Sequence, residues 1–300
     1  MFDFLKKNKD TYEIIVPATS ANLGPGFDTL GISFELFNHF IIKRSDKYEF
    51  VNVKEEYQNT NNLVIVAARK TYEYLKVKEK PFSLEIKENV PVSRGLGSSA
   101  TCILAGVIGG MLVSGKHLSD EEIVNIATSV EGHPDNIAPA YYGALTSSFL
   151  EDDNVIITQY DVSRDLIFTV LVPDFSLETK KAREVLPKEV NMKDAVYNIS
   201  RVVGIPKAFE QGDVSKLLHL MSDKLHEPYR YPLIKDSDVF IRFAEKEKLP
   251  LCISGSGSTL LLISKESMID KLNKVKVDSK WGYQELKVCK KGTTWATIND

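Results

Sequence analysis

Little in this sequence indicates a chain held together by cross-links or attracted to nucleic acid. Its 300 residues include three cysteines, Cys102, Cys252 and Cys289, which are far apart and set among apolar residues. An odd number at such spacing favours neither a disulfide framework nor a cysteine-based metal site. The net charge of -3, without a basic run interleaved with aromatics, gives no general attraction for nucleic acid.

Long apolar runs are also missing. The longest, residues 102–113, is interrupted by glycines and falls well short of the ~20 residues that span a bilayer. Residues 1–10 lack the apolar core of a secretory signal and are interpreted as a polar leader. We therefore expect a cytoplasmic protein without a membrane partner. Its share of hydrophobic residues, 43%, is ordinary for a globular chain, and its length leaves room for two domains.

A glycine-rich turn directly before a long apolar helix dominates the middle of the chain, Pro91-Val-Ser-Arg-Gly-Leu-Gly-Ser-Ser-Ala-Thr101. Gly95 and Gly97 can adopt backbone angles closed to other residues, and Ser98 and Ser99 can cap the helix. Exposed amides at a helix start form an anion site that needs no basic side chain. The turn therefore predicts a phosphate-binding loop. For this stretch alone, an ordinary glycine turn that caps a core helix is the better interpretation.

Two common phosphate motifs do not fit this turn. The order of glycines formally matches the dinucleotide pattern G-x-G-x-x-G/A, but residues 91–94 separate the preceding strand from Gly95. The acids that follow, Asp120 and Glu121, open another helix instead of ending a second strand. The P-loop pattern fails because no Gly-Lys-Ser/Thr follows the turn. The loop is thus of a different, lysine-free kind.

Two further polar segments are candidates for a ligand site. Residues 19–28, after a strand predicted over residues 12–18, form a tight loop in which Asn22 and Asp28 can grip a small polar ligand. Tight polar turns of this composition are common without function.

The second segment is Glu131-Gly-His-Pro-Asp-Asn136, at the end of a helix that begins at Ser119 in a predicted capping box. An acid at a helix C-terminus is unfavourable unless a cation compensates it, so Glu131 indicates a metal, with a solvent-exposed helix end as an equal alternative. The polar groups of His133, Asp135 and Asn136 follow at once.

The second half of the chain alternates strands with helices, which predicts an α/β sandwich. We place the domain boundary at a charged break, giving domains 1–164 and 165–300. A glycine and serine loop over residues 254–259 joins two short strands and can lie beside a nucleotide or substrate, or be a flexible hairpin loop. The helices expected here cover residues 193–210, 213–226, 236–246 and 266–275.

Two arginines in this half differ from the general background of lysines. Arg183 follows a strand end, and Arg230 lies in a rigid turn with two prolines. Arginine is the usual residue for two-pronged capture of a carboxylate or phosphate. Most arginines are solvated surface charges, so from their local sequence alone neither is assigned a function.

Taken together, residues 17–28, 95–100 and 254–258 resemble the three motifs of the GHMP kinases. Residues 22–28 combined with 131–136 are similar to the homoserine kinase branch of that family. The resemblance covers nearly the whole chain from Tyr12. It implies an α+β, two-domain GHMP kinase fold, with a left-handed βαβ crossover in the N-terminal domain and a ferredoxin-like α/β sandwich in the C-terminal one.

The resemblance also implies roles for the ambiguous residues, with ATP and Mg²⁺ as cofactors. The ATP-binding loop would consist of Pro91, Val92, Ser93, Arg94, Gly95, Leu96, Gly97, Ser98, Ser99, Ala100 and Thr101. Ser99 and Glu131 would hold Mg²⁺. The substrate-binding residues would be Asn22, Asp28, His133, Asn136, Arg183 and Arg230, and the catalytic ones Glu131, Asp135 and Asn136.

The expected reaction is transfer of the ATP γ-phosphoryl group to the hydroxyl of homoserine. Asp28 would suit the ammonium group of this amino acid, and the two arginines its carboxylate. Phosphoryl transfer depends mainly on alignment and charge neutralisation, so the hydroxyl proton can pass to Asp135 or to the phosphate. The alternatives are a kinase of a mevalonate-like alcohol and an inert homologue that binds a metabolite. We also expect a homodimer, the common state of such enzymes.

Overall fold

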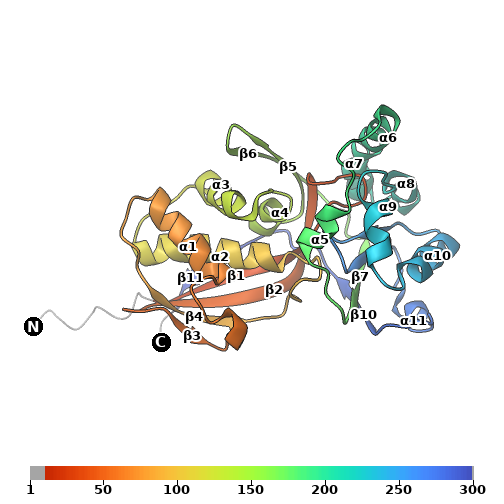
Figure 1. Ribbon diagram of the computed structural model, residues 1–300. Helices are drawn as coiled ribbons and strands as arrows, with labels where there is room; N and C mark the ends of the chain where they lie inside the picture. Colours follow the sequence, from red (N-terminus) through yellow and green to blue (C-terminus); the bar gives the residue numbers. More distant parts are fainter. Residues whose placement is uncertain (1–10, 299–300) are drawn as a thin grey trace, which may run out of the picture.

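The computed structural model describes residues 11–298, so the polar leader expected over residues 1–10 lies outside the described part. The chain forms two sheets flanked by helices (Figure 1). The first sheet has seven strands, in the order β11-β1-β2-β4-β3, with β5 and β6 continuing from β2. The second has four antiparallel strands in the order β10-β7-β9-β8. The mixed α+β class expected from the sequence is confirmed.

Most of the first sheet comes from the first half of the chain. Its strands are β1 (Thr11–Ala21), β2 (Leu30–Arg44), β3 (Glu49–Val51), β4 (Phe82–Lys87), β5 (Leu145–Glu151), β6 (Asn154–Tyr160) and, from the far end of the chain, β11 (Thr294–Thr297). The helices of this half are the 3-10 turn η1 (Glu55–Tyr57), α1 (Leu63–Tyr74), α2 (Ser98–Ser114), α3 (Asp120–Glu131) and α4 (Ile137–Tyr142). Helices α1 to α4 lie on one face of this sheet (Figure 1).

A parallel strand pair interrupts the otherwise antiparallel first sheet. Strands β3 and β4 run side by side with Glu49 opposite Ser83, and the chain passes between them through α1. This is the βαβ unit expected for the N-terminal half. The left-handedness expected of its crossover stays a prediction.

Local signals fixed several helix ends as expected. The sequence offers Asn61 or Asn62 as the cap of α1, and the structure uses Asn62, whose side chain accepts a hydrogen bond from the Val64 amide. Ser119 and Glu122 form the predicted capping box of α3, whose last residue is Glu131. The two serines that follow Gly97 do not cap α2, contrary to expectation. Gly97 itself is the N-cap residue, with a left-handed φ of 70° and no side-chain cap. Neither serine hydroxyl is therefore used to cap the helix, and that of Ser99 donates to Glu131 instead.

Two helices expected in the second half are each broken in the structure. The helix expected over residues 193–210 is interrupted at Gly204, because Pro206 has no amide to donate and begins a new helix. The helix expected over residues 213–226 ends at Leu220. The Asp223 carboxylate then accepts hydrogen bonds from three successive amides, which starts a separate short helix.

The remaining elements surround the second sheet. Its strands are β7 (Ile167–Pro173), β8 (Leu251–Ile253), β9 (Leu260–Ser264) and β10 (Trp281–Leu286). Its helices are α5 (Thr179–Glu184), α6 (Met192–Val202), α7 (Ile205–Gln211), α8 (Val214–Leu220), α9 (Glu227–Arg230), α10 (Ser237–Glu247) and α11 (Ile269–Leu272), with the 3-10 turn η2 (Tyr231–Leu233). On one face of this sheet, α10 and α11 cover a core that contains Leu171, Phe240 and Leu272.

The other face of the second sheet shares a core with the first sheet. Phe168 of β7 is fully buried, and its ring lies 5.4 Å from that of Phe34 in β2 and 6.0 Å from that of Phe209 in α7. Strand β11 also returns from the end of the chain to pair with β1, where Ile15 faces Thr294. The division into domains 1–164 and 165–300 stays a prediction, and the two parts pack together without a solvent layer at this core.

Within residues 11–298, no helix is both long and apolar enough to cross a bilayer. The three cysteines are free thiols, two of them buried and Cys102 partly exposed.

The shared core yields a stability prediction. Phe168→Ala removes a ring that both sheets contact, so we expect the free energy of unfolding to fall by about 3–5 kcal/mol. Phe149→Ala is the matched control, because that ring is 52% exposed on β5 and its loss should cost less than about 1 kcal/mol. Urea denaturation followed by circular dichroism measures both. Equal losses for the two variants would contradict a shared core at Phe168.

Candidate active site

A cavity of about 590 Å³ opens between the two halves of the chain. Most of the residues singled out from the sequence line it: Asn22, Asp28, Val92, Ser93, Arg94, Gly95, Gly97, Ser98, Ser99, Glu131, His133, Asp135, Asn136, Arg183 and Arg230. The other four expected residues, Pro91, Leu96, Ala100 and Thr101, are not part of the cavity wall. The motifs that lie far apart in the sequence thus meet around one space.

The first glycine of the predicted phosphate loop packs backbone against backbone. Gly95 has φ +80°, and a Cβ atom built on it would lie 2.1 Å from the Ser254 carbonyl oxygen. The Ser254 hydroxyl donates to the Gly95 carbonyl at 2.7 Å, and the Thr259 amide donates to the Arg94 carbonyl at 3.0 Å. The glycine and serine loop of the second half therefore supports the phosphate loop and lies beside it.

The second glycine makes an equally close contact with the first strand. A Cβ atom on Gly97 would lie 2.0 Å from the Thr19 hydroxyl oxygen. That hydroxyl donates to Asn136 Oδ1 at 2.6 Å, and the Thr19 amide donates to the Leu96 carbonyl at 3.1 Å. Thr19 thus joins three predicted segments. The sequence placed it at the start of the loop predicted over residues 19–28, whereas the structure continues β1 through Ala21.

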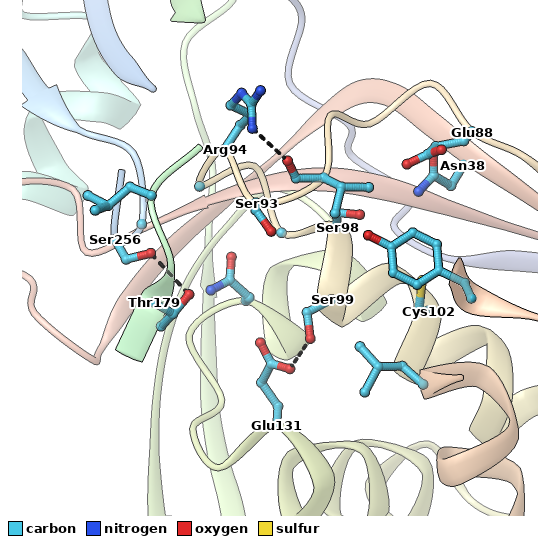
Figure 2. Close-up of a pocket in the computed structure, with 18 of the residues that line it drawn as sticks. Asn38, Glu88, Ser93, Arg94, Ser98, Ser99, Cys102, Glu131, Thr179 and Ser256 are labelled. Carbon is cyan, nitrogen blue, oxygen red and sulfur yellow. Dashed lines mark hydrogen bonds between the residues drawn. The ribbon is translucent and has the colours of Figure 1, made fainter. Parts of the chain in front are cut away.

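At the start of α2, the Ser99 hydroxyl donates to Glu131 Oε2 at 2.7 Å (Figure 2). Burial raises the pKa of the Glu131 carboxyl, against the opposing effect of the Ser99 hydrogen bond. Within residues 11–298 no cluster of three or more His, Cys, Asp or Glu side chains can hold a metal by itself. The hydroxyl and the carboxylate together offer two oxygen donors beside the phosphate loop.

Thr101 supports the phosphate loop from behind. Its hydroxyl donates to the Ser98 carbonyl at 2.7 Å and accepts from the Asn38 amide at 3.0 Å. The Asn38 oxygen in turn accepts from the Asn89 and Val90 amides, which lead into the loop. Asn38 is 1% exposed, and the sequence offered no signal for it beyond an amide side chain within a strand.

His133 and Asp135 form a close pair on the wall of the cavity. His133 Nδ1 lies 2.5 Å from Asp135 Oδ1. Burial disfavours a charged imidazole, but the hydrogen bond and charge of Asp135 outweigh it, so the pKa of His133 is raised. The main chain at Asp135 sits against β2 at Gly31, where a Cβ atom would lie 1.9 Å from the Asp135 carbonyl oxygen. The carboxylate is thereby held in place at the cavity.

Asp28 and Arg183 meet across the two halves of the chain. Arg183 donates through Nη2 to Asp28 Oδ1 at 2.8 Å and through Nη1 to Oδ2 at 3.0 Å. This two-pronged pair raises the pKa of Arg183. Asn22 fixes the same loop, since its oxygen accepts from the Asp28 amide at 2.9 Å and its amide donates to the Gly255 carbonyl at 2.6 Å.

Arg230 is a buried cation next to this pair. It is 1% exposed and donates to the carbonyls of Ala182 and Gly255 at 3.1 and 3.3 Å. Burial, and to a lesser degree the charge of Arg183, lowers its pKa to about 10, so the guanidinium is charged at neutral pH. No carboxylate in the described part of the chain lies within salt-bridge distance of it. Arg230 is therefore a cation on the cavity wall with which an anionic ligand group can pair.

Beyond the phosphate loop, the cavity continues into a part lined by the first half alone. The side chains there mix apolar and amide groups: Val53, Lys54, Tyr57, Asn61, Asn62, Leu63, Ile86, Glu88 and Cys102. Lys54 is paired with Glu88 at 2.9 Å. The cavity is thus lined both by the glycine loop with the residues proposed from the motifs and by this further set from the first half.

Known proteins are similar to this chain in sequence and in fold. Residues 62–144 match the family model of the GHMP kinases N terminal domain. A crystal structure of homoserine kinase from Cytophaga hutchinsonii superposes with a TM-score of 0.82 at 24% identity, covering 99% of each chain. The L. major mevalonate kinase structure has a TM-score of 0.69 at 14% identity, covering 91% of this chain and 95% of its own. The fold is therefore that of the GHMP kinase class.

Sequence similarity narrows this class. The homoserine kinase of Clostridium botulinum (strain Okra / Type B1) is 37% identical over 288 residues, which cover 94% of this chain and 97% of that protein. The chain belongs to the homoserine kinase family. Membership in a GHMP kinase family implies use of ATP, as the resemblance in the sequence indicated.

The contact at Gly95 yields a prediction for the phosphate loop. Gly95→Ala adds a methyl group against the Ser254 carbonyl at a left-handed φ, and we expect it to cost about 2–5 kcal/mol of stability. We expect ATP affinity to fall roughly tenfold or more, because the loop must shift. Thermal unfolding and calorimetric titration with ATP measure both.

Gly115→Ala is the matched control for that substitution. Gly115 has φ +73° at the end of α2, but a Cβ atom there meets only Arg44 Nη2 at an ordinary 3.7 Å. It should cost about 1–2 kcal/mol and leave ATP affinity unchanged. An ATP affinity that is the same in both variants would show that the contact of Gly95 with the Ser254 carbonyl does not shape the nucleotide site.

Proposed function

We propose that this protein is a homoserine kinase, which transfers the γ-phosphoryl group of ATP to the side-chain hydroxyl of L-homoserine. The product, O-phospho-L-homoserine, belongs to threonine biosynthesis. Membership in the homoserine kinase family supports the reaction. The observation that carries the choice of substrate is Arg230, a buried cation without a carboxylate partner among the described residues, beside the Asp28 and Arg183 pair.

The charges at this end of the cavity suit an amino acid zwitterion. The Arg183 charge is already paired with the Asp28 carboxylate, whereas Arg230 has no carboxylate within salt-bridge distance among the described residues, so a substrate carboxylate can pair with it. The substrate ammonium group then finds the Asp28 oxygens, which already accept from Arg183. Asn22, His133 and Asn136 line the same part of the cavity and complete the proposed substrate site. An alcohol without an ammonium group leaves Asp28 with no new partner.

The glycine loop suits the phosphates of ATP. Its amides and the positive end of the 17-residue helix α2 favour negative charge in the space beside Ser98 and Ser99. We propose that Ser99 and Glu131 hold Mg²⁺, because a hard cation that also binds phosphates and waters needs only one or two protein oxygens. When bound, Mg²⁺ neutralises charge on the transferring phosphate. Glu131 and Ser99 hold each other in place for that role.

Asp135 is the proposed acceptor of the hydroxyl proton. Asp135 lines the cavity together with the glycine loop and the two arginines, and His133 fixes one of its carboxylate oxygens. Asn136, anchored by the Thr19 hydroxyl, positions the substrate beside it. Because transfer depends chiefly on alignment, the main task of these residues is to hold the hydroxyl in line with the phosphate.

The adenine base is proposed to occupy the part of the cavity lined by Tyr57, Leu63, Ile86 and Cys102. We further propose that the protein acts in the cytoplasm, which its three free thiols support. A homodimer is also proposed, supported by an exposed apolar face of α6 and the residue after it, formed by Met192, Val196, Ile199 and Val203.

The substrate proposal predicts a ranking of acceptors. With ATP and Mg²⁺, kcat/KM measured from ADP release should be highest with homoserine. It should be at least roughly tenfold lower with serine, whose side chain is one methylene shorter. Mevalonate should be poorer still, because it has no group to pair with Asp28. Activity on mevalonate alone would favour the rival alcohol kinase, and ATP binding without turnover of any acceptor would favour an inert homologue.

The role of Asp135 predicts a loss in turnover. Asp135→Asn keeps an oxygen for His133 but cannot take a proton, so kcat should fall by roughly 100-fold to 10,000-fold while the KM for homoserine changes little. Steady-state kinetics at saturating ATP measure both constants. Turnover near that of the wild type, with unchanged substrate affinity, would exclude Asp135 as the proton acceptor and leave direct transfer to the phosphate.

A further inference from the structure

His226 lies directly behind the substrate end of the cavity, and the reaction proposed above does not use it. It is fully buried and precedes α9, whose last residue is Arg230. Its ring stacks on Phe27 with centroids 5.1 Å apart and an angle of 22° between the planes. The Arg230 guanidinium lies over the other ring of this stack, 5.2 Å from the Phe27 centroid. The imidazole is therefore packed between the loop of residues 22–28 and Arg230.

Both ring nitrogens of His226 have partners that fix the tautomer. Nδ1 lies 3.2 Å from Arg230 Nη1, and a guanidinium can only donate, so Nδ1 accepts and carries no proton. Nε2 lies 2.9 Å from the Gly24 carbonyl oxygen, which can only accept, so Nε2 carries the proton. Burial lowers the pKa of His226 and outweighs the opposing charge of Asp223, whose Oδ2 lies 3.9 Å from Nε2, while the charge of Arg230 acts in the same direction as burial. The ring is thus a neutral bridge between a cation and a carbonyl.

The hydrogen bond to Nδ1 decides which face of Arg230 is available to a ligand. The Nε and Nη1 donors are used by Ala182, His226 and Gly255. The Nη2 group makes no hydrogen bond to the residues that the structure describes, and Arg230 lines the cavity. Without an acceptor at Nδ1, one Nη1 hydrogen is left buried and unpaired, and only the bonds to Ala182 and Gly255 still direct Nη2.

The other nitrogen holds a loop whose backbone is strained. The backbone φ angles of Asn22, Leu23 and Asp28 are 73°, 44° and 53°, values that are uncommon for residues other than glycine. Such conformations persist only where surrounding contacts hold them. The bond from His226 Nε2 to Gly24, together with that from Asn22 to Gly255, supplies such contacts from the second half. One side chain thus touches both the proposed carboxylate site and the proposed ammonium site.

We infer that His226 is a positioning residue for substrate recognition: its neutral ring directs Arg230 toward the substrate carboxylate through Nδ1 and ties the loop that bears Asp28 through Nε2. This inference rests on the proposed function. The Nδ1 bond, made to a charged group, has the larger effect on substrate affinity. His226 touches no reacting atom, so its influence falls on KM for homoserine and not on the chemical step.

Two substitutions separate the two bonds. In His226→Asn, the amide oxygen takes the place of Nδ1 and still accepts from Arg230, but nothing reaches Gly24. In His226→Gln, the amide nitrogen takes the place of Nε2 and still donates to Gly24, but Arg230 loses its acceptor. His219→Gln, on an exposed histidine of α8, is the matched control. Steady-state kinetics of each variant, with homoserine and ATP varied in turn, give both KM values and kcat.

We expect His226→Gln to raise the KM for homoserine about tenfold, with the KM for ATP and kcat within about twofold of the wild type. His226→Asn should keep the KM for homoserine within about threefold, and the control should match the wild type. A loss of structure alone would raise both KM values or lower the active fraction, and the ATP data reveal it.

The inference is overturned if His226→Gln leaves the KM for homoserine unchanged, or if His226→Asn is impaired as much as His226→Gln. If the wild type phosphorylates homoserine and the variants give either of these results, the proposed role of His226 is wrong but the proposed function stands. A wild-type protein that neither binds nor phosphorylates homoserine contradicts the proposed function and this inference together.

Discussion

The substrate end of this protein depends on keeping one guanidinium charged where water hardly reaches. Among the residues that the structure describes, Arg230 is the largest fully buried side chain. An isolated buried charge is unfavourable unless fixed dipoles or other charges compensate it. The carbonyls of Ala182 and Gly255 and the nearby charge of Asp28 do so here. Each belongs to a different segment of the chain. Segments that stabilise the cation are consequently the segments that shape the pocket around a substrate.

A second constraint acts at the glycine loop, where backbones from distant segments touch. Neither Gly95 nor Gly97 leaves room for a Cβ atom, because the Ser254 carbonyl and the Thr19 hydroxyl occupy those positions. Side-chain bulk is removed where three segments must converge, and the amides of the loop stay free to face an anion. The aromatic core around Phe168 also lies where the two halves of the chain meet. The site is therefore complete only when the two halves of the chain are packed together.

Signals confined to one segment predicted some helix ends correctly and others wrongly. The cap at Asn62 and the end of α3 at Glu131 follow from side chains that satisfy neighbouring amides, so the local sequence contains the whole argument. The family motifs added the fold and the set of residues that meet at the cavity. Contacts between distant segments stayed hidden: Asp28 bonds to Arg183 across the two halves of the chain, and a lone histidine such as His226 gives no signal until its partners are placed around it.

The pairing of β11 with β1 has a consequence for the order in which the chain is made. Strand β1 is synthesised well before its partner, because Thr294, which pairs with Ile15, follows almost 280 residues later. During that interval one edge of the first sheet has unpaired amides and carbonyls, the kind of edge on which other chains add. Until β11 pairs with β1, that edge can add a strand from another chain, so the late pairing of these two strands closes the first sheet against aggregation.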